Sequence, residues 1–434
     1  MTASNTADRS IAVGVTGVGA RGVSLLRRCT MMDEVDIVAV CDVQDRRLEA
    51  ATDALREADR PEPTHFHDHE TMLASSDLDA VIIATSWRFH TPMAIQAMEA
   101  AVVPAMDVGP ASSVEECWEL VRTAERTGVD CMLLENSCFG RDQLAVLRMV
   151  REGLFGTLSH CECGYCHDLR GRLNAISGTS REESAHIETG DRYFRGIQHE
   201  KRNGDLYPTH GVGPMAACLD INHGNRFVSL SSFAAAPHGL RDWGKRNLPP
   251  DHPSRDVDWA HGDVITTVLR CANGQTLTVT HDVNLPRADN SKRYVVRGTR
   301  GMWQAERDAV YVDDRSPDHE WESLAPYRDE FEHPIWAQYQ RQGVKRGHGG
   351  ADYLVLRSFF EAISQDVRPP IDVYDAATWR AISPLSEQSI AAGGAPVAVP
   401  DFTNGGWMTD EPILGITGEV GPNRLDHTRV IPGE

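Results

Sequence analysis

The sequence predicts an α/β protein with an N-terminal Rossmann domain, a doubly wound parallel sheet, followed by a C-terminal α+β domain with a mixed, largely antiparallel sheet. Its 434 residues exceed the usual size of a single hydrophobic core. Short apolar runs alternate with amphipathic segments in the first third of the chain, and one-faced strands follow later. We expect the two domains to cover residues 8–137 and 138–434.

The expected strands of the first domain are short and apolar throughout, as in a parallel sheet that is buried on both faces. Helical patterns separate these strands. The expected strands are Ile11–Thr16, Asp36–Cys41, Ala80–Thr85, Val102–Asp107 and Cys131–Leu134.

The second domain shows the alternation of apolar and polar residues that is typical of strands with one buried face. This pattern predicts strands at Asp263–Leu269, Gln275–Asp282 and Tyr294–Gly298. The sequence GTRG at Gly298–Gly301 resembles a hairpin turn. The segment Ala236–Arg255 is rich in Pro and His, so we expect a long surface loop there.

The composition excludes several classes of function. A net charge of −20 repels a phosphate backbone, so we expect no nucleic-acid partner. No apolar run approaches the roughly 20 residues that span a bilayer, and the first residues lack a signal-peptide pattern, so we expect a cytoplasmic protein that is not in a membrane. The chain has only four lysines, Lys201, Lys245, Lys292 and Lys345, so no lysine of the first domain can take part in chemistry.

A glycine motif follows the first expected strand and precedes a helical pattern. Gly17, Gly19 and Gly22 meet the spacing G-x-G-x-x-G, in which the glycines allow a tight turn, approach to a pyrophosphate and close helix packing. Asp42 ends the next strand, 20 residues after Gly22, where a carboxylate can bind the ribose hydroxyls. A carboxylate there repels a 2′-phosphate, so the motif favours NAD over NADP as cofactor.

Several segments resemble a known family. The glycine motif with Arg21, and the sequence WRFHTPM at Trp87–Met93, resemble the Gfo/Idh/MocA oxidoreductase superfamily. Within it the chain is most similar to glycoside hydrolase family 109, the NAD-dependent α-N-acetylgalactosaminidases. The segments that carry this closer resemblance are Glu135-Asn136, Tyr165–His167, Tyr207–Pro214 (YPTHGVGP), Gly347–Gly350 and Pro400–Thr403.

The chain departs from the sugar dehydrogenases of that superfamily at one motif. These enzymes carry Glu-Lys-Pro after the fifth strand, and its lysine assists hydride transfer, whereas this chain has Asp107-Val108-Gly109. Family 109 typically has Glu-Val there. The family also has a tyrosine shortly before its Gly-Thr-x-Gly turn, where Asn290 stands here, so we expect Asn290 to replace an aromatic contact to the sugar.

The resemblance implies which residues surround the two ligands. Those expected around NAD are Gly17, Gly19, Ala20, Arg21, Gly22, Asp42, Trp87, His90, Asp107, Val108 and Asn136. Those expected around a small glycoside substrate are Tyr165, Arg195, Tyr207, Pro208, Thr209, His210, Asn290 and His348.

The family mechanism is an oxidation at C3 of the sugar, an elimination, an addition of water and a reduction. It needs proton acceptors and a proton donor rather than a pair of carboxylates. Tyr207 and His210 lie three apart at an expected helix start and can share a face, while Tyr165 and His167 lie two apart on an expected strand and point to one side. These four residues are the catalytic candidates, with base and acid unassigned among them.

The segment CECGYCH at Cys161–His167 contains the spacing of a haem attachment site and three thiols that could bind zinc. On a strand, however, Cys163 and Cys166 face opposite ways, which suits no single tetrahedral site. We therefore expect no bound metal or haem.

Two other functions stay open. The first alternative is an NAD-dependent sugar or inositol dehydrogenase that uses Tyr207 and His210 in place of the lysine, and the second is a nucleotide-binding sensor without activity. The sequence leaves the aglycone and the anomeric preference undetermined. We expect a homo-oligomer, because sheet-mediated oligomers are common in the superfamily.

Overall fold

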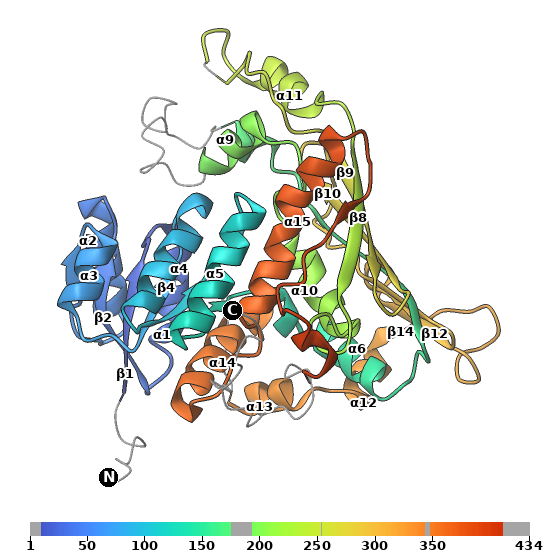
Figure 1. Cartoon of the computed structure of the whole chain (residues 1–434), viewed down its shortest axis with the longest axis horizontal. Helices are drawn as coiled ribbons and strands as arrows, with labels where there is room; N and C mark the ends of the chain where they lie inside the picture. Colours follow the sequence, from blue (N-terminus) through green and yellow to red (C-terminus); the bar gives the residue numbers. More distant parts are fainter. Residues whose placement is uncertain (1–9, 175–192, 253, 343–347, 411–434) are drawn as a thin grey trace, which may run out of the picture.

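The structure is a computed structural model and describes residues 10–174, 193–252, 254–342 and 348–410. In Figure 1 the N-terminal domain and the large sheet of the second domain lie at opposite sides of the molecule, with helix α15 (Val373–Ala391) between them. The fold class predicted from the sequence is confirmed.

The first domain contains a six-stranded parallel sheet in the order β3-β2-β1-β4-β5-β6. Its strands are β1 (Ile11–Thr16), β2 (Val35–Cys41), β3 (Thr64–Phe66), β4 (Ala80–Ile83), β5 (Val103–Met106) and β6 (Met132–Leu133). Its helices are α1 (Ala20–Cys29), α2 (Asp45–Arg56), α3 (His69–Ser75), η2 (Trp87–Phe89), α4 (His90–Glu99) and α5 (Val114–Thr127). The strand order reverses between β1 and β4, and the crevice at the carboxyl ends of these strands is where ligands bind in such sheets.

All five strands expected in this domain are present, each with bounds within two residues of those expected. Strand β3 was missed because it has three residues, lies at the sheet edge and includes two exposed polar positions, Thr64 and His65. Such a short strand has no apolar run to detect.

The second domain contains a nine-stranded mixed sheet in the order β14-β13-β12-β11-β7-β10-β9-β8-β15. Only β7 and β10 pair in parallel among its described strands. The strands are β7 (Leu158–Cys166), β8 (Phe227–Ala234), β9 (Val264–Cys271), β10 (Thr276–Asp282), β11 (Val295–Gly298), β12 (Gly301–Gln304), β13 (Ala309–Val312), β14 (Glu322–Ser323) and β15 (Val397–Ala398). The predicted hairpin is confirmed, because β11 and β12 pair antiparallel across Thr299-Arg300.

The loop expected at residues 236–255 is wrong in part, because helix α11 (Gly239–Asn247) forms within it. The carboxylate of Asp263 accepts hydrogen bonds from the backbone N–H groups of His238 (3.0 Å) and Gly239 (2.8 Å) and so caps the helix start. This cap comes from a distant residue, so local composition could not reveal it. The prolines that suggested a loop lie outside the helix in the sequence, at position 237 before it and at 249, 250 and 253 after it.

The remaining helices connect and cover the two sheets. They are η3 (Asn136–Phe139), α6 (Arg141–Arg151), α7 (Arg170–Leu173), α9 (Tyr193–Lys201), α10 (Thr209–Cys218), η4 (Ala305–Arg307), α12 (Leu324–Glu330), α13 (Pro334–Gln342), η5 (His348–Gly350), α14 (Ala351–Gln365) and η6 (Gly406–Met408). Helix α15 packs on α5 of the first domain and on β8 of the second, so residues late in the chain cover the N-terminal domain (Figure 1). The division at residues 137 and 138 stays a prediction.

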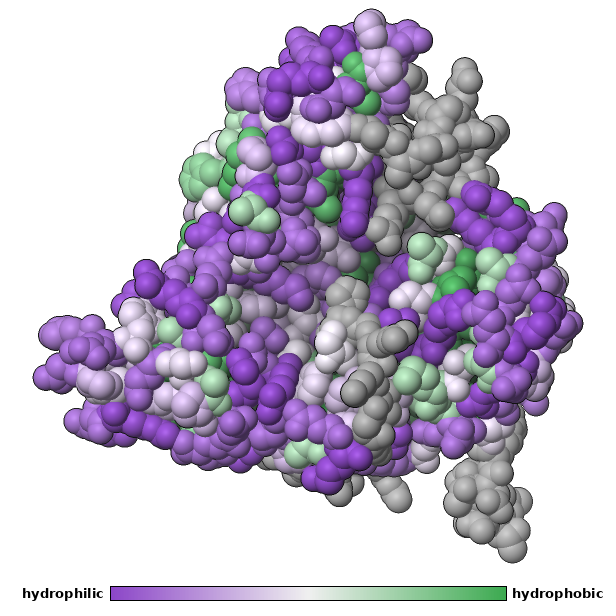
Figure 2. Space-filling view, turned by 180° about the vertical axis from the view of Figure 1, so that it is seen from behind, coloured by the Kyte–Doolittle hydropathy of each residue, from purple (hydrophilic) through white to green (hydrophobic). Residues whose placement is uncertain are grey.

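Hydrophilic residues cover most of the face of the molecule that Figure 2 shows. Large apolar side chains that reach the surface include Phe233 and Val268 on the adjacent strands β8 and β9. Among the described residues, no helix has both the length and the apolar character needed to cross a membrane.

One fully buried arginine ties α15 to the first domain. The guanidinium of Arg380 donates hydrogen bonds to the carbonyls of Gly109 (3.2 Å) and Pro110 (3.3 Å) and to the hydroxyl of Thr91 (2.8 Å). The carboxylate of Glu116 lies 3.5 Å from the same guanidinium. A buried charge is tolerated only when it is paired and hydrogen-bonded, so this contact fixes how α15 sits on the N-terminal domain.

We predict that Arg380→Met lowers the free energy of unfolding by about 3–5 kcal/mol, because it leaves the carboxylate of Glu116 buried without its cation. The urea midpoint of unfolding measures the loss. Arg122→Met, which removes an exposed ion pair with Glu115 on α5, is the matched control and should change stability by at most about 1 kcal/mol. Adding Glu116→Gln to Arg380→Met should recover part of the loss. Equal urea midpoints for Arg380→Met and its control Arg122→Met would contradict the prediction.

Candidate active site

A cavity of about 880 Å³ lies where the carboxyl ends of the first-domain strands meet the second domain. It is the size of a typical ligand site. Predicted cofactor-binding residues that line it are Gly17, Gly19, Ala20, Arg21, Asp42, Trp87, Asp107, Val108 and Asn136. Predicted catalytic and sugar-binding residues that line it are Tyr165, His167, Arg195, Tyr207, His210 and Asn290.

The glycine turn between β1 and α1 has the geometry of a dinucleotide site. Gly17 has φ +84°, a conformation that side chains disfavour, and a Cβ on Gly22 would lie 1.9 Å from the carbonyl oxygen of Gly17. Helix α1 begins at Ala20 with neither a side-chain cap nor an acidic residue in its first turn. Its first N–H groups therefore face the cavity as an uncapped, positive helix end, which fits the pyrophosphate of a dinucleotide.

Asp42 follows β2 at the edge of this cavity. Its carboxylate accepts a hydrogen bond from the backbone N–H of Gln44 (3.1 Å) and lies 3.5 Å from the guanidinium of Arg47. Burial raises the pKa of Asp42, while Arg47 and the Gln44 N–H favour the charged form. The position suits contacts with vicinal ribose hydroxyls.

Arg21 joins the glycine turn to three other segments. Its guanidinium donates to Asp107 (3.1 Å) and to both carboxylate oxygens of Asp352 (3.1 Å each), and the amide of Asn136 donates to Asp352 (2.7 Å). Burial opposes the charge of Arg21, but the two carboxylates raise its pKa above the usual range. This network connects the cofactor side of the cavity to α14.

His210 lies at the start of α10, as the sequence predicts, and contacts a buried carboxylate. Its Nδ1 is 2.6 Å from Glu135, which follows β6 and is fully buried. Burial by itself raises the pKa of Glu135, but His210, Thr209 and Lys292 outweigh it and hold the pKa at about 2. Burial lowers the pKa of His210. Because an ionised carboxylate only accepts, Nδ1 of the neutral ring carries the proton, and Nε2 keeps a lone pair for a proton transfer.

Tyr207 and Arg195 form a second pair beside His210. The ring of Tyr207 lies 4.9 Å from that of His210, and Arg195 donates a long hydrogen bond (3.5 Å) to the Tyr207 hydroxyl. Arg195 also lies over the rings of Trp87 (4.9 Å) and Tyr207 (4.8 Å). Burial raises the pKa of Tyr207, and the guanidinium opposes this by favouring the phenolate.

Tyr165 and His167 point to one side at the end of β7, as predicted. Their rings stack at 4.1 Å, and Tyr165 lies 4.4 Å from Tyr207 and 5.7 Å from His210. Burial, followed by the nearby His210 and Lys292, lowers the pKa of His167 to about 4, so this imidazole is neutral near pH 7. Four proton-transfer side chains therefore face one cavity.

Several predicted residues lie elsewhere. Gly22 packs beneath the turn, Pro208 and Thr209 form the buried start of α10, and none of them lines the cavity. His90 is also buried away from it, with Nε2 3.0 Å from the carbonyl of Thr85. Gly347 and the side chain of His348 lie outside the described residues.

Three residues of the site were missed from the sequence. Glu135 contacts His210, and Asp352 accepts hydrogen bonds from Arg21 and Asn136. Lys292 lines the cavity, and its Nζ lies 2.7 Å from the Ser137 hydroxyl. Burial lowers the pKa of Lys292. The position of Glu135 at the carboxyl end of a strand is a signal that could have found it. Asp352 is far from its partners in sequence, so no local sequence signal indicated its role.

Comparisons with known proteins agree with this architecture. Residues 11–134 match the oxidoreductase family with an NAD-binding Rossmann fold, Gfo/Idh/MocA. A levoglucosan dehydrogenase in complex with NADH and L-sorbose has a TM-score of 0.65 at 20% identity over 91% of this chain and 100% of its own. An oxidoreductase domain protein from Kribbella flavida has a TM-score of 0.68 at 17% identity, over 90% of this chain and 100% of its own. The chain is thus of the Gfo/Idh/MocA class and has an NAD-type cofactor domain.

The second domain narrows the class further. Residues 139–409 match the glycosyl hydrolase 109 C-terminal domain. A glycosyl hydrolase family 109 protein of Stenotrophomonas maltophilia is 40% identical over 95% of this chain and 93% of its own. An alpha-N-acetylgalactosaminidase of Tannerella forsythia is 40% identical over 94% of this chain and 90% of its own. The chain belongs to glycosyl hydrolase family 109, which confirms the resemblance found in the sequence.

We predict that the purified protein carries a nicotinamide dinucleotide and that Gly22→Ala loses it, because the added Cβ would collide with the carbonyl of Gly17 and open the turn. Nucleotide released on heating and quantified by chromatography measures this. Gly244→Ala, at a helical position whose added Cβ would meet no atom closer than 3.5 Å, is the control and should keep the nucleotide. Equal nucleotide contents in both variants would contradict the prediction.

Proposed function

We propose that the protein is an NAD-dependent glycosidase that oxidises C3 of its sugar transiently and cleaves the glycosidic bond by elimination and addition of water. The observation that carries this proposal is the contact of His210 with Glu135 (2.6 Å) at the same cavity as the glycine turn. It provides an oriented, neutral imidazole at the dinucleotide site. Tyr207 and Tyr165 supply further proton-transfer groups within ring-contact distance.

The residues present fit NAD. The uncapped start of α1 suits the pyrophosphate, and the carboxylate of Asp42 suits the ribose hydroxyls while repelling a 2′-phosphate. Asp107, Val108 and Trp87 would lie around the nicotinamide end of the cavity. We therefore propose NAD rather than NADP.

The bound nicotinamide supplies reversible hydride chemistry at C3. The chain's own residues handle protons. His210 Nε2 can accept the proton of a sugar hydroxyl, because Glu135 holds the ring in the Nδ1–H tautomer. Arg195 favours the phenolate of Tyr207, but burial outweighs it and raises the pKa of this hydroxyl above its usual value. Tyr207 is therefore protonated near pH 7 and can donate its proton or pass one on.

The order of bond changes follows from the chemistry of a ketone. Oxidation at C3 makes the proton at C2 acidic, so a base removes it while the bond between C1 and the glycosidic oxygen breaks and that oxygen takes up a proton. Water then adds to C1, C2 regains a proton, and C3 is reduced again. The cofactor is unchanged after each turnover, and the net reaction is hydrolysis.

The proposed substrate is an α-N-acetylgalactosaminide or a related glycoside, supported by the relative of Tannerella forsythia named for that activity. Asn290 at the exposed rim of the cavity stands where the family usually has a tyrosine, so contacts to the substituent at C2 differ here. The homo-oligomer and the cytoplasmic location stay predictions from the sequence.

A sugar dehydrogenase is the second candidate, and Lys292 is the observation that favours it. This lysine lines the cavity and its pKa is lowered by burial, as a lysine that assists oxidation requires. A dehydrogenase accumulates NADH from free sugar, whereas the glycosidase cleaves nitrophenyl glycosides without added cofactor and leaves no NADH.

We predict that glycoside cleavage in deuterated water places deuterium at C2 of the released sugar, because the elimination removes that proton. NMR of the product measures the exchange. Tyr207→Phe and His210→Ala should keep the bound nucleotide and lose about 10²–10⁴ in turnover, the usual cost of removing a proton-transfer group. Cleavage with the original hydrogen kept at C2 would rule out the elimination and favour direct displacement.

We predict that the acidic limb of the pH profile lies below pH 6.5, the ordinary imidazole value, because burial lowers the pKa of His210 and activity is lost only when the ring is protonated. Glu135→Gln removes the charge that raises this pKa, so the limb should move to still lower pH. Turnover should also fall, by up to about 10⁴, the loss that a wrong imidazole tautomer causes in serine hydrolases. Measuring kcat/KM against pH tests both, and an unmoved limb in the variant would show that His210 is not the group observed.

A further inference from the structure

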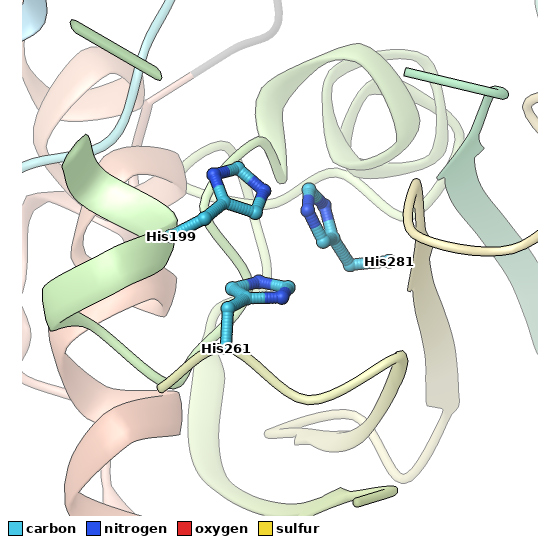
Figure 3. Close-up of side chains that lie close together, drawn as sticks. All are labelled: His199, His261 and His281. Atoms are coloured by element: carbon cyan, nitrogen blue, oxygen red, sulfur yellow. The ribbon is translucent and has the colours of Figure 1, made fainter. Parts of the chain in front are cut away.

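Three histidines lie close together outside the cavity described above. His199 comes from α9, His261 from the segment before β9, and His281 from β10, and all three side chains are buried (Figure 3). One ring nitrogen of each lies within 4.8 Å of one on each of the others. Figure 3 shows the three rings grouped around a common space.

The Nδ1 atoms of the three rings face oxygen acceptors. Nδ1 of His199 is 2.8 Å from the carbonyl of Arg195, and Nδ1 of His261 is 2.7 Å from the carbonyl of Gly262. Nδ1 of His281 lies 3.3 Å from the carboxylate of Asp205, although the angles are not those of a hydrogen bond. For His199 this acceptor fixes the tautomer that leaves Nε2 with a lone pair, as the partners of metal-binding histidines do. Nδ1 of His261 also lies 3.1 Å from the amide nitrogen of Asn284, so that ring can carry its proton on either nitrogen.

The Nε2 atoms of His199 and His281 are buried and have no hydrogen-bond partner among the residues that the structure describes. Nε2 of His261 lies 3.0 Å from the carbonyl of Gly204 and donates to it when it carries the ring proton. Metal binding through Nε2 requires that proton to lie on Nδ1, where the carbonyl of Gly262 accepts it at 2.7 Å. Buried polar atoms without partners destabilise the folded chain, which is a cost in stability. A cation between the Nε2 atoms would remove that cost.

The rings of His199 and His261 are neutral near pH 7, and neutral imidazole is the form that binds metal. Burial lowers the pKa of His199 to about 3, and burial together with His199 and His281 lowers the pKa of His261 well below its usual value. Three imidazole nitrogens grouped within 4.8 Å of one another match the donor set of zinc and of other first-row divalent ions.

We propose that His199, His261 and His281 bind one divalent transition-metal ion, with zinc as the preferred ion, through their Nε2 atoms. Metal binding breaks the hydrogen-bond contact of His261 with the carbonyl of Gly204, and that carbonyl oxygen is then available as a further ligand of the ion. This site is separate from the segment Cys161–His167, on which the expectation of no bound metal rested. None of the three histidines lines the cavity, so the ion takes no part in the sugar chemistry.

The ion would help to position Tyr165 and Tyr207 through residues on the side away from the cavity. The ring of His281 stacks on that of Tyr165 at 6.1 Å. The carboxylate of Asp205, next to His281, accepts a hydrogen bond from the backbone N–H of Tyr207 (3.1 Å). A metal that fixes His281 therefore fixes two elements that position Tyr165 and Tyr207.

The test is the metal content of the full chain. After exposure to zinc sulfate and removal of free metal, we expect about one zinc per chain by elemental analysis. His199→Gln and His281→Gln should each lower this at least tenfold. The matched control is His160→Gln on β7, whose side chain contacts Thr276 and is partly exposed, and it should keep the zinc.

Two measurements on the unsubstituted chain cover the case in which the variants fail to fold. A chelator should lower the thermal midpoint and zinc should restore it. Cobalt loading should give the absorption of a site with nitrogen ligands and no thiolate-to-cobalt charge-transfer band, which separates this site from the buried cysteines. Zinc contents far below one per chain with an unchanged midpoint, or a thiolate band, would overturn the proposal.

Discussion

The hydrogen bond between Glu135 and His210 is the constraint on which the site depends. It joins the carboxyl end of β6 in the first domain to the start of α10 in the second, and Gly213 lets that helix approach so closely that a Cβ there would lie 3.0 Å from Cγ of Glu135. Because the carboxylate is buried and ionised, the imidazole must direct its proton toward it. The same contact thus links the carboxyl end of β6 to α10 and orients the imidazole of His210.

Paired charges explain how an anionic chain can build a cofactor cavity. Arg21 is held by Asp107 and Asp352, and Arg195 lies over aromatic rings instead. These contacts offset the cost of burying each guanidinium, and they leave the uncapped start of α1 as a positive end for a pyrophosphate. A net charge of −20 is therefore compatible with a dinucleotide, because the local field at the turn differs from that of the whole surface.

Local patterns were enough for much of the fold. The strands of the first sheet, the glycine turn and the GTRG hairpin follow from apolar runs and glycine positions that neighbouring residues define. Strand β3 and helix α11 were missed, because the first is a short edge strand and the second is capped by Asp263 from a distant segment. The site residues that belong to sequence motifs were predicted. Asp352 and Lys292 were not predicted, because their partners lie far away in sequence.

The sequence by itself determined the class of fold, the dinucleotide motif and the family, because these depend on short spacings of residues with fixed local geometry. Only the tertiary structure decided which side chains act together. Glu135 reaches His210 across 75 positions, and Arg21 reaches Asp352 across 331. The buried histidines 199, 261 and 281 meet only after α9, a loop and β10 have packed. Such contacts depend on how distant elements fill one core, and no local pattern encodes that packing.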